Sequence, residues 1–274
     1  MLTQTLKRCF GALGAVRIPF GPLRGMLLKW DPSLSLRETL GLTDRKDMRY
    51  LNAALKLLLE NRKRDLVMVD AGSNMGLYSL YCAKAFGRNI KKIFAFEPNP
   101  STYSILCENL KLNQMDKVEA VPIALSESRG TVRFEITANN HTAHLSTAYQ
   151  SPNSQGNQIE VCTDTLDGFF SEASKRDLPD FIKMDIEGAA KHALLPVAHI
   201  IEKNRPWFFV ESHSLEEDAT IGYLAVRYGY GAFDINREIW VADLTKTFPD
   251  PHGVSGKLIL VPNEIGRPDF VRSK

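Results

Sequence analysis

Three ionisable side chains fall on one side of a short apolar segment, the run from Phe181 to Glu187. A strand buried in a parallel sheet should be apolar on both sides, so Lys183, Asp185 and Glu187 favour a catalytic site. Asp185, near the end of the strand, is predicted to act as general base or to orient a substrate hydroxyl. Lys183 is predicted to pair with a carboxylate and hold it ionised. Glu187 is open to two interpretations, a site residue or a carboxylate that favours the first turn of a helix.

A second polar pair follows the next apolar run, where Glu211 and His213 share a side. An imidazole can accept a proton at neutral pH, which makes His213 a candidate base; a surface or hydrogen-bonding histidine is the alternative. Asp185, Glu187 and Glu211, together with His213, offer ligands for Mg²⁺ or another divalent ion. Their spacing in the sequence does not show convergence in space, so a metal is possible but not expected.

A glycine loop, Asp70-Ala-Gly-Ser-Asn-Met-Gly76, follows another short apolar run. Gly72 and Gly76 permit positive φ and a close backbone approach. A dinucleotide fingerprint would need glycines at positions 74 and 77, where the chain has Asn74 and Leu77. Asn74 adds bulk where a pyrophosphate would lie, so the loop favours a nucleoside without phosphates.

S-adenosylmethionine is such a nucleoside, and three further positions fit it. Asp70 could reach the ammonium of its methionine part directly or through water, and Glu97 could accept hydrogen bonds from both ribose hydroxyls. Residues 123–126, with Ala124 among them, should border the adenine. The loop residues Gly72, Asn74 and Gly76 complete the predicted cofactor site.

Strands and helices alternate around these residues, which predicts a doubly wound, mostly parallel sheet of the Rossmann-like type. We expect seven strands, one of them antiparallel. The predicted strands cover residues 66–70, 92–97, 118–124, 180–186, 207–211, 233–244 and 257–261, and the predicted helices 45–62, 76–86, 100–112, 188–203 and 215–228. Residues 131–136 and 158–162 alternate polar and apolar types and predict an inserted β-hairpin around a polar stretch, 137–157.

The domain division follows from this pattern: a basic arm and helical extension over residues 1–62, and one nucleoside-binding domain over 63–274. No stretch of about 20 apolar residues could span a membrane, although the basic N-terminus could touch an anionic membrane surface. Four scattered cysteines fit a reducing compartment, and we expect a cytoplasmic protein. A net charge of +2 gives no reason to expect a nucleic-acid partner, and the oligomeric state cannot be predicted.

Five segments together resemble the FkbM family of methyltransferases, in content and in order. They are Val69–Ser79, Ala95–Asn99, Thr165–Asp167, Ile182–Gly188 and Val210–His213. The resemblance implies a class I methyltransferase fold and, most often, methyl transfer to a hydroxyl of a sugar or another natural-product scaffold. The family motif commonly continues Glu-Gly-Ala/Phe-Glu, whereas this chain has Ala190 in place of the last acid.

The leading hypothesis is therefore an S-adenosylmethionine-dependent O-methyltransferase acting on a small molecule or glycan. An N- or protein methyltransferase is a second hypothesis, because a carboxylate could orient an amine without a strong base. A catalytically silent nucleoside-binding subunit is a third. Asn74 counts against an NAD-dependent oxidoreductase.

Overall fold

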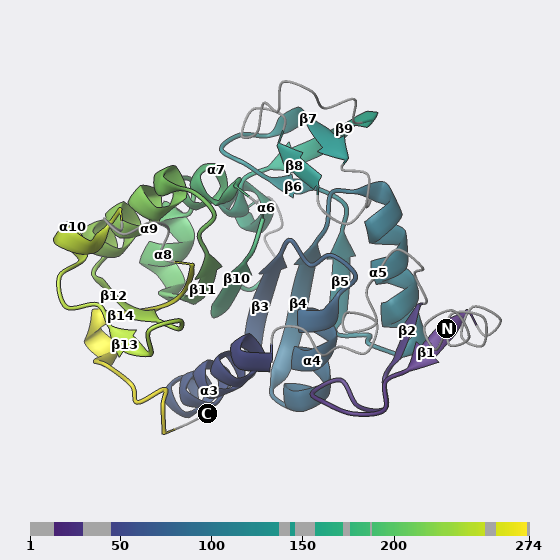
Figure 1. The fold of residues 1–274 in the computed structure, drawn as a ribbon, viewed down its shortest axis with the longest axis horizontal. Coiled ribbons are helices and arrows are strands. Elements are labelled where there is room, and N and C mark those ends of the chain that lie inside the picture. The colour runs from purple at the N-terminus through teal and green to yellow at the C-terminus, as the bar shows by residue number, and fades with distance from the viewer. Residues whose placement is uncertain are drawn as a thin grey trace, which may run out of the picture.

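A twisted eight-stranded sheet forms the centre of the molecule (Figure 1). The computed structural model describes residues 14–29, 45–136, 143–145, 157–171, 176–186, 188–249 and 256–272. From one edge of the sheet to the other, the strands are β13 (Ile239–Trp240), β12 (Tyr230–Asp234), β14 (Lys257–Pro262), β11 (Trp207–Glu211), β10 (Phe181–Met184), β3 (Leu66–Ala71), β4 (Ile90–Phe96) and β5 (Val118–Val121).

The strand directions confirm the predicted class I methyltransferase fold. Strands β11, β10, β3, β4 and β5 run parallel, and β14 lies antiparallel between β11 and β12. One expected strand, residues 233–244, was wrong in extent. It begins earlier, at Tyr230, and is divided by a turn in which Asp234 Oδ1 accepts hydrogen bonds from the amides of Asn236 and Arg237. The short strand after that turn, β13, makes the sheet eight-stranded.

Both faces of the sheet are buried, because successive residues of its central strands enter different apolar clusters. On β3, for example, Met68 belongs to one cluster while Val67 and Val69 belong to the other. Helices α3 (Arg45–Arg62), α4 (Leu77–Phe86) and α5 (Pro100–Leu112) cover the first face. Helices α6 (Leu166–Ser171), α7 (Ala190–Leu194), α8 (Ala198–Asn204) and α9 (Leu215–Tyr228) cover the second, and α10 (Leu244–Thr247) contacts α9.

Two prolines explain where the predicted elements were too long. The helix expected over 188–203 is two helices, α7 and α8, with Pro196 between them, because proline lacks the N–H that a helix interior needs. The strand expected over 118–124 ends at Val121, directly before Pro122. Ala124 instead begins a strand of a second sheet.

That second sheet lies beyond the carboxyl ends of β3, β4 and β5 (Figure 1). Its strand order is β6 (Ala124–Leu125), β9 (Asn157–Asp164), β7 (Gly130–Ile136) and β8 (Ala143–Leu145). Strands β7 and β9 are antiparallel, which confirms the predicted hairpin. Of the polar stretch 137–157, only residues 143–145 and 157 are among the described residues.

Part of the predicted basic arm, residues 14–29, packs on the domain. Strands β1 (Ala15–Arg17) and β2 (Leu27–Lys29) form a hairpin, and the Lys29 amide donates to Asn109 Oδ1 of α5 at 2.6 Å. The reason is apolar spacing that the basic residues obscured: Val16, Ile18, Leu23, Met26 and Leu28 are all buried. Among the described helices, none combines the length and the apolar character that crossing a bilayer requires.

Candidate active site

The glycine loop after β3 packs directly against the end of β10. Gly72 has φ +73°, and a Cβ at this position would lie 1.9 Å from the carbonyl oxygen of Asp185. The amides of Gly72 and Ser73 both donate to the carbonyl oxygen of Phe96, at 3.1 and 2.9 Å. The loop is thereby held between the ends of β4 and β10, and only glycine allows this approach.

Asn74 and Gly76 complete the turn into α4. Asn74 also has positive φ, +51°, which asparagine tolerates better than most residues, and its Oδ1 accepts a hydrogen bond from the Met75 amide at 2.7 Å. Gly76, with φ +90°, is the N-cap of α4. The amides of Asn74, Met75 and Gly76 donate to Glu97 Oε2, Asn74 Oδ1 and the Ser73 carbonyl oxygen, so the turn that leads into α4 is fixed by its own hydrogen bonds.

Glu97 lies buried at the end of β4, where the sequence placed it. Its two oxygens accept hydrogen bonds from the amides of Asn74 and Asn99, each at 2.9 Å. Burial raises the pKa of Glu97 to about 7, although these hydrogen bonds act in the opposite direction. Each carboxylate oxygen can accept a second hydrogen bond, so the carboxylate can also accept hydrogen bonds from the two hydroxyls of a ribose. That contact stays a prediction.

Asp70 is buried behind the loop. Its Oδ2 accepts a hydrogen bond from Ser79 Oγ at 2.7 Å. Its Oδ1 lies 3.4 Å from Lys183 Nζ and has no hydrogen-bond partner among the described residues. A buried oxygen in this state can accept from a water or an ammonium group, which fits the methionine part of S-adenosylmethionine. The predicted contact of Asp70 with that ammonium is not tested by these distances.

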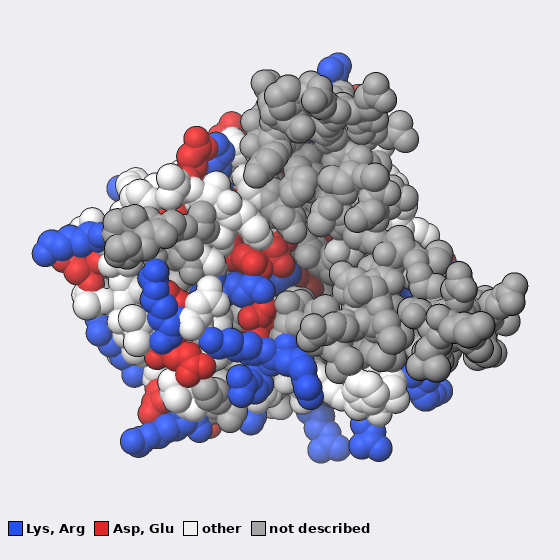
Figure 2. Space-filling view, viewed as in Figure 1, with Lys and Arg blue, Asp and Glu red and all other residues white. Residues whose placement is uncertain are grey.

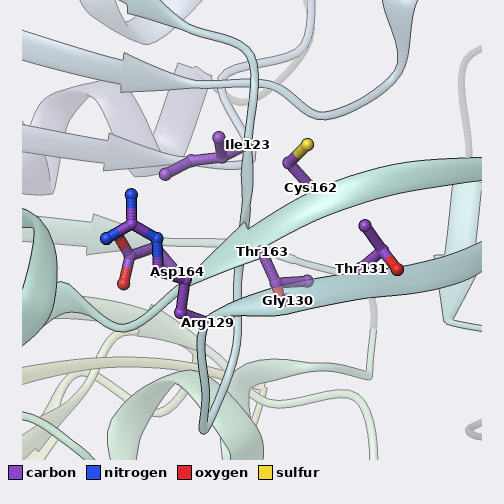
Figure 3. Close-up of a pocket in the computed structure, with 7 residues that line it drawn as sticks. All are labelled: Ile123, Arg129, Gly130, Thr131, Cys162, Thr163 and Asp164. Carbon is purple, nitrogen blue, oxygen red and sulfur yellow. The ribbon is translucent and has the colours of Figure 1, made fainter.

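Ala124, predicted to border the adenine, is buried on β6 in a small cluster with Val161 and Ala189. A groove of about 390 Å³ opens beside the neighbouring Ile123 (Figure 3). Arg129 and Asp164 are among the residues that line this groove. The role of Ala124 stays a prediction.

Lys183 is the buried cation of the site. Its Nζ lies 3.4 Å from Asp70 Oδ1, 3.6 Å from Asp185 Oδ2 and 4.5 Å from the centre of the Tyr78 ring. Burial alone would lower the pKa of Lys183, but the charges of Asp70 and Asp185 outweigh it, so the pKa is raised. The ammonium group is therefore charged and lies between two carboxylates, the pairing that the sequence predicted.

Asp185, Glu211 and His213 converge where β10 and β11 end. His213 Nε2 lies 3.7 Å from Asp185 Oδ1 and 3.7 Å from Glu211 Oε1. All three side chains are partly buried. Glu187, the fourth predicted catalytic residue, lies outside the described residues.

Glu217 was missed by the sequence analysis, although its carboxylate holds the loops after β10 and β11 in place. It is fully buried; Oε1 accepts from the Ala190 amide and Oε2 from the His213 amide, both at 2.7 Å. The sequence does contain a signal, because Ser214 and Glu217 have the spacing of a helix-capping pair. That signal indicates the start of α9, and the Ser214 side chain indeed accepts from the Glu217 amide, but it does not indicate a link to β10.

Lys257 and Asp47 were also missed. Lys257 Nζ pairs with Asp47 of α3 and lies 3.3 Å from Glu211 Oε2. Burial is the main cause that raises the pKa of Glu211, followed by the negative charge of Asp185, while Lys257 acts against both. Figure 2 shows acidic and basic side chains gathered at the middle of the face, near the ends of β3 and β10.

A sequence profile of the methyltransferase FkbM domain matches residues 70–232, more than half of the chain. The chain belongs to the FkbM methyltransferase family. This FkbM-family chain is 29% identical to hexuronic acid methyltransferase AglP of Haloferax volcanii over 174 residues, which are 62% of this chain and 65% of that protein. Methyltransferase sdnD of Sordaria araneosa is 46% identical over 66 residues, 24% of this chain and 25% of that protein. The matches thus span less than two thirds of the length of both relatives.

Among solved structures, the crystal structure of a methyltransferase FkbM from Methylobacillus flagellatus KT is similar to this FkbM-family chain with a TM-score of 0.44. The two chains are 16% identical, and the match covers 72% of this chain and 43% of that one.

Proposed function

We propose that this protein is an S-adenosylmethionine-dependent methyltransferase that methylates a hydroxyl of a sugar, glycan or other small natural product. The observation that carries the proposal is the convergence of Asp185, Glu211 and His213 beside the glycine loop. The glycine loop, our predicted nucleoside site, and a set of proton-accepting groups thus lie at the same edge of the sheet, where ligands of doubly wound folds bind.

S-adenosylmethionine, when bound, supplies a methyl group activated by its positively charged sulfur. The protein's part is to hold the acceptor hydroxyl in line with that methyl group and to receive its proton. Asp185, with Lys183 holding it ionised, is the first candidate for receiving the proton or orienting the hydroxyl. His213 is the second candidate, because its Nε2 faces the same space and its backbone is fixed by Glu217.

The family and its relatives support a sugar acceptor. The relative from Haloferax volcanii is a hexuronic acid methyltransferase. Carboxylates and an imidazole can bind sugar hydroxyls, since each accepts hydrogen bonds. At position 190, where relatives commonly carry an acid, this chain has alanine and so lacks that carboxylate, and the acceptor can therefore differ from theirs.

An amine acceptor is the second candidate, because Asp185 and Glu211 place two negative charges where a protonated amine would bind. In that case the carboxylates would orient the amine, and the reaction would not need a strong base. A cytoplasmic location, which the sequence suggested, stays a prediction, as does the division at residue 62.

The test is a calorimetric titration with S-adenosylmethionine followed by a screen for release of S-adenosylhomocysteine with uronic-acid glycans, neutral glycans and amines. We expect binding, and turnover with a hydroxylated acceptor. Asp185→Ala should keep cofactor affinity within about threefold and lower turnover by roughly 10²–10⁴-fold. Binding without turnover on any acceptor would favour a silent subunit, and tighter binding of NADH would remove the proposal.

A further inference from the structure

The cluster of Asp185, Glu211 and His213 has a feature that proton transfer alone does not need. Each of the three residues offers one ligand atom, and these atoms all lie within 4.8 Å of one another. They come from the ends of two adjacent parallel strands, which are rigid supports. The sequence could not show this convergence, and for that reason no metal was expected.

We propose that Asp185, Glu211 and His213 bind a divalent metal ion at the catalytic edge of the sheet. Ligand atoms within 4.8 Å of one another need only small side-chain rotations for each to lie about 2.1 Å from one shared ion. Two such atoms 3.7 Å apart, the distance from His213 Nε2 to each carboxylate, subtend an angle of roughly 120° at the ion. That angle lies within the range of four- and five-coordinate sites.

The surroundings of His213 support the proposal independently of these distances. Its Nδ1 lies 3.8 Å from Oε2 of the fully buried Glu217, while its Nε2 faces Asp185 and Glu211. Histidine ligands of metals commonly direct the second ring nitrogen toward a carboxylate, which fixes the ring and increases its basicity. Glu217 is itself fixed by two backbone amides, so its carboxylate is held beside the ring before any ion binds.

The charges around the cluster also favour a cation. Two lysines face it, but Lys183 also contacts Asp70 and Lys257 also contacts Asp47. Four carboxylates therefore contact the two ammonium groups, namely Asp47, Asp70, Asp185 and Glu211, and a fifth, that of Glu217, lies beside the His213 ring. A bound divalent ion would offset most of the remaining negative charge.

The ligand set indicates which ions would bind. One imidazole with two carboxylates suits Mn²⁺, Fe²⁺ or Zn²⁺, whereas Ca²⁺ prefers oxygen ligands alone. Three protein ligands leave positions open, and these would hold two neighbouring oxygens of the acceptor. This last role rests on the proposed function, but binding of the ion does not.

The test is a titration of the full-length protein with Mn²⁺, followed by electron paramagnetic resonance, without cofactor or acceptor. We expect one bound ion per chain, and at least tenfold weaker binding in each of Asp185→Asn, Glu211→Gln and His213→Asn, since each removes a ligand. The matched control is Glu127→Gln: Glu127 Oε2 lies 3.4 Å from His192 Nδ1, a similar pair for which the described residues offer no third ligand. This control should bind Mn²⁺ as the unmodified protein does.

Absence of bound Mn²⁺, or equal binding in the three cluster variants and the control, would overturn the metal site. Methylation assays in EDTA, which removes divalent ions, separate the metal-site proposal from the proposed methyltransferase function. Undiminished methylation in EDTA would leave the enzyme proposal standing and remove the metal from the reaction. Stoichiometric Mn²⁺ binding without methylation of any acceptor would support the ion site and count against the proposed function.

Discussion

At the scale of single residues, Glu97 combines two properties that can be separated by experiment, because its carboxylate is buried and also faces the predicted ribose site. Replacing Glu97 by Gln removes a charged acceptor. A hydrogen bond to a charged group contributes about 1.5–3 kcal/mol, so Glu97→Gln should weaken S-adenosylmethionine binding about ten- to hundredfold. Calorimetry would measure this loss of affinity for S-adenosylmethionine. Glu119→Gln on the neighbouring β5, a partly exposed carboxylate paired with Lys92, should bind normally.

The same residue predicts the direction of a pH dependence. The pKa of Glu97 is raised from 4.5 to about 7 in the fold, so between these values the folded state holds a proton that the unfolded chain has lost. The contribution of Glu97 to the free energy of unfolding therefore falls as pH rises from 4.5 to 7. Cofactor binding should change in the opposite direction, because ribose hydroxyls donate to the ionised form. Affinity should rise roughly tenfold from pH 6 to pH 8, and an unchanged affinity would contradict the assignment.

Single residues also show the limit of the sequence analysis. Lys183 and Asp185 could be found because their charges interrupt a strand that should be apolar on both sides. The role of Glu217 could not be found, since it depends on α9 placing its first turn against the start of α7, a contact between distant segments. The burial of Asp70 behind Lys183 and Ser79 could not be predicted for the same reason.

At the scale of elements, the glycine loop and β10 must approach closely for the cofactor loop and Asp185 to share an edge. Gly72→Ala should destabilise the protein by about 2–5 kcal/mol. A left-handed conformation costs an L-residue about 1–2 kcal/mol, and forcing the new Cβ against the Asp185 carbonyl adds roughly 1–3 kcal/mol. Urea unfolding would measure the loss.

Gly25 provides the matched control, because its φ is +87° and a Cβ there would meet no atom within 4 Å. Gly25→Ala should therefore cost only the conformational part, about 1–2 kcal/mol. Equal losses in the two variants would show that the loop and β10 are not in contact.

The sequence predicted both the glycine loop and the strand β10, but not the contact between them. It likewise predicted most helices and strands but failed at Pro122 and Pro196, where proline ended an otherwise continuous pattern.

At the scale of the whole molecule, α3 belongs to the same core as the sheet. Its buried residues Leu51 and Leu55 share an apolar cluster with Met68 of β3 and Trp207 of β11. The helix could be predicted from its apolar spacing, but the sequence could not show which face of the sheet it covers. The Asp47–Lys257 pair further connects α3 to the site, since Lys257 also contacts Glu211.

A common core predicts one cooperative unfolding transition that includes α3. Leu55→Ala should lower the free energy of unfolding by about 2–5 kcal/mol, the loss typical of a buried leucine, whereas Lys56→Ala on the exposed side should change it by less than about 0.5 kcal/mol. Tryptophan fluorescence, which includes the buried Trp207, and circular dichroism should shift together in Leu55→Ala, because both then report the same transition. If α3 were an independent extension, the fluorescence midpoint would stay where it is in the unmodified protein while part of the helical signal was lost at lower urea. A coincident shift would therefore show that the sheet carrying Asp185 and Glu211 is stabilised by residues that precede the family-matched region in the chain.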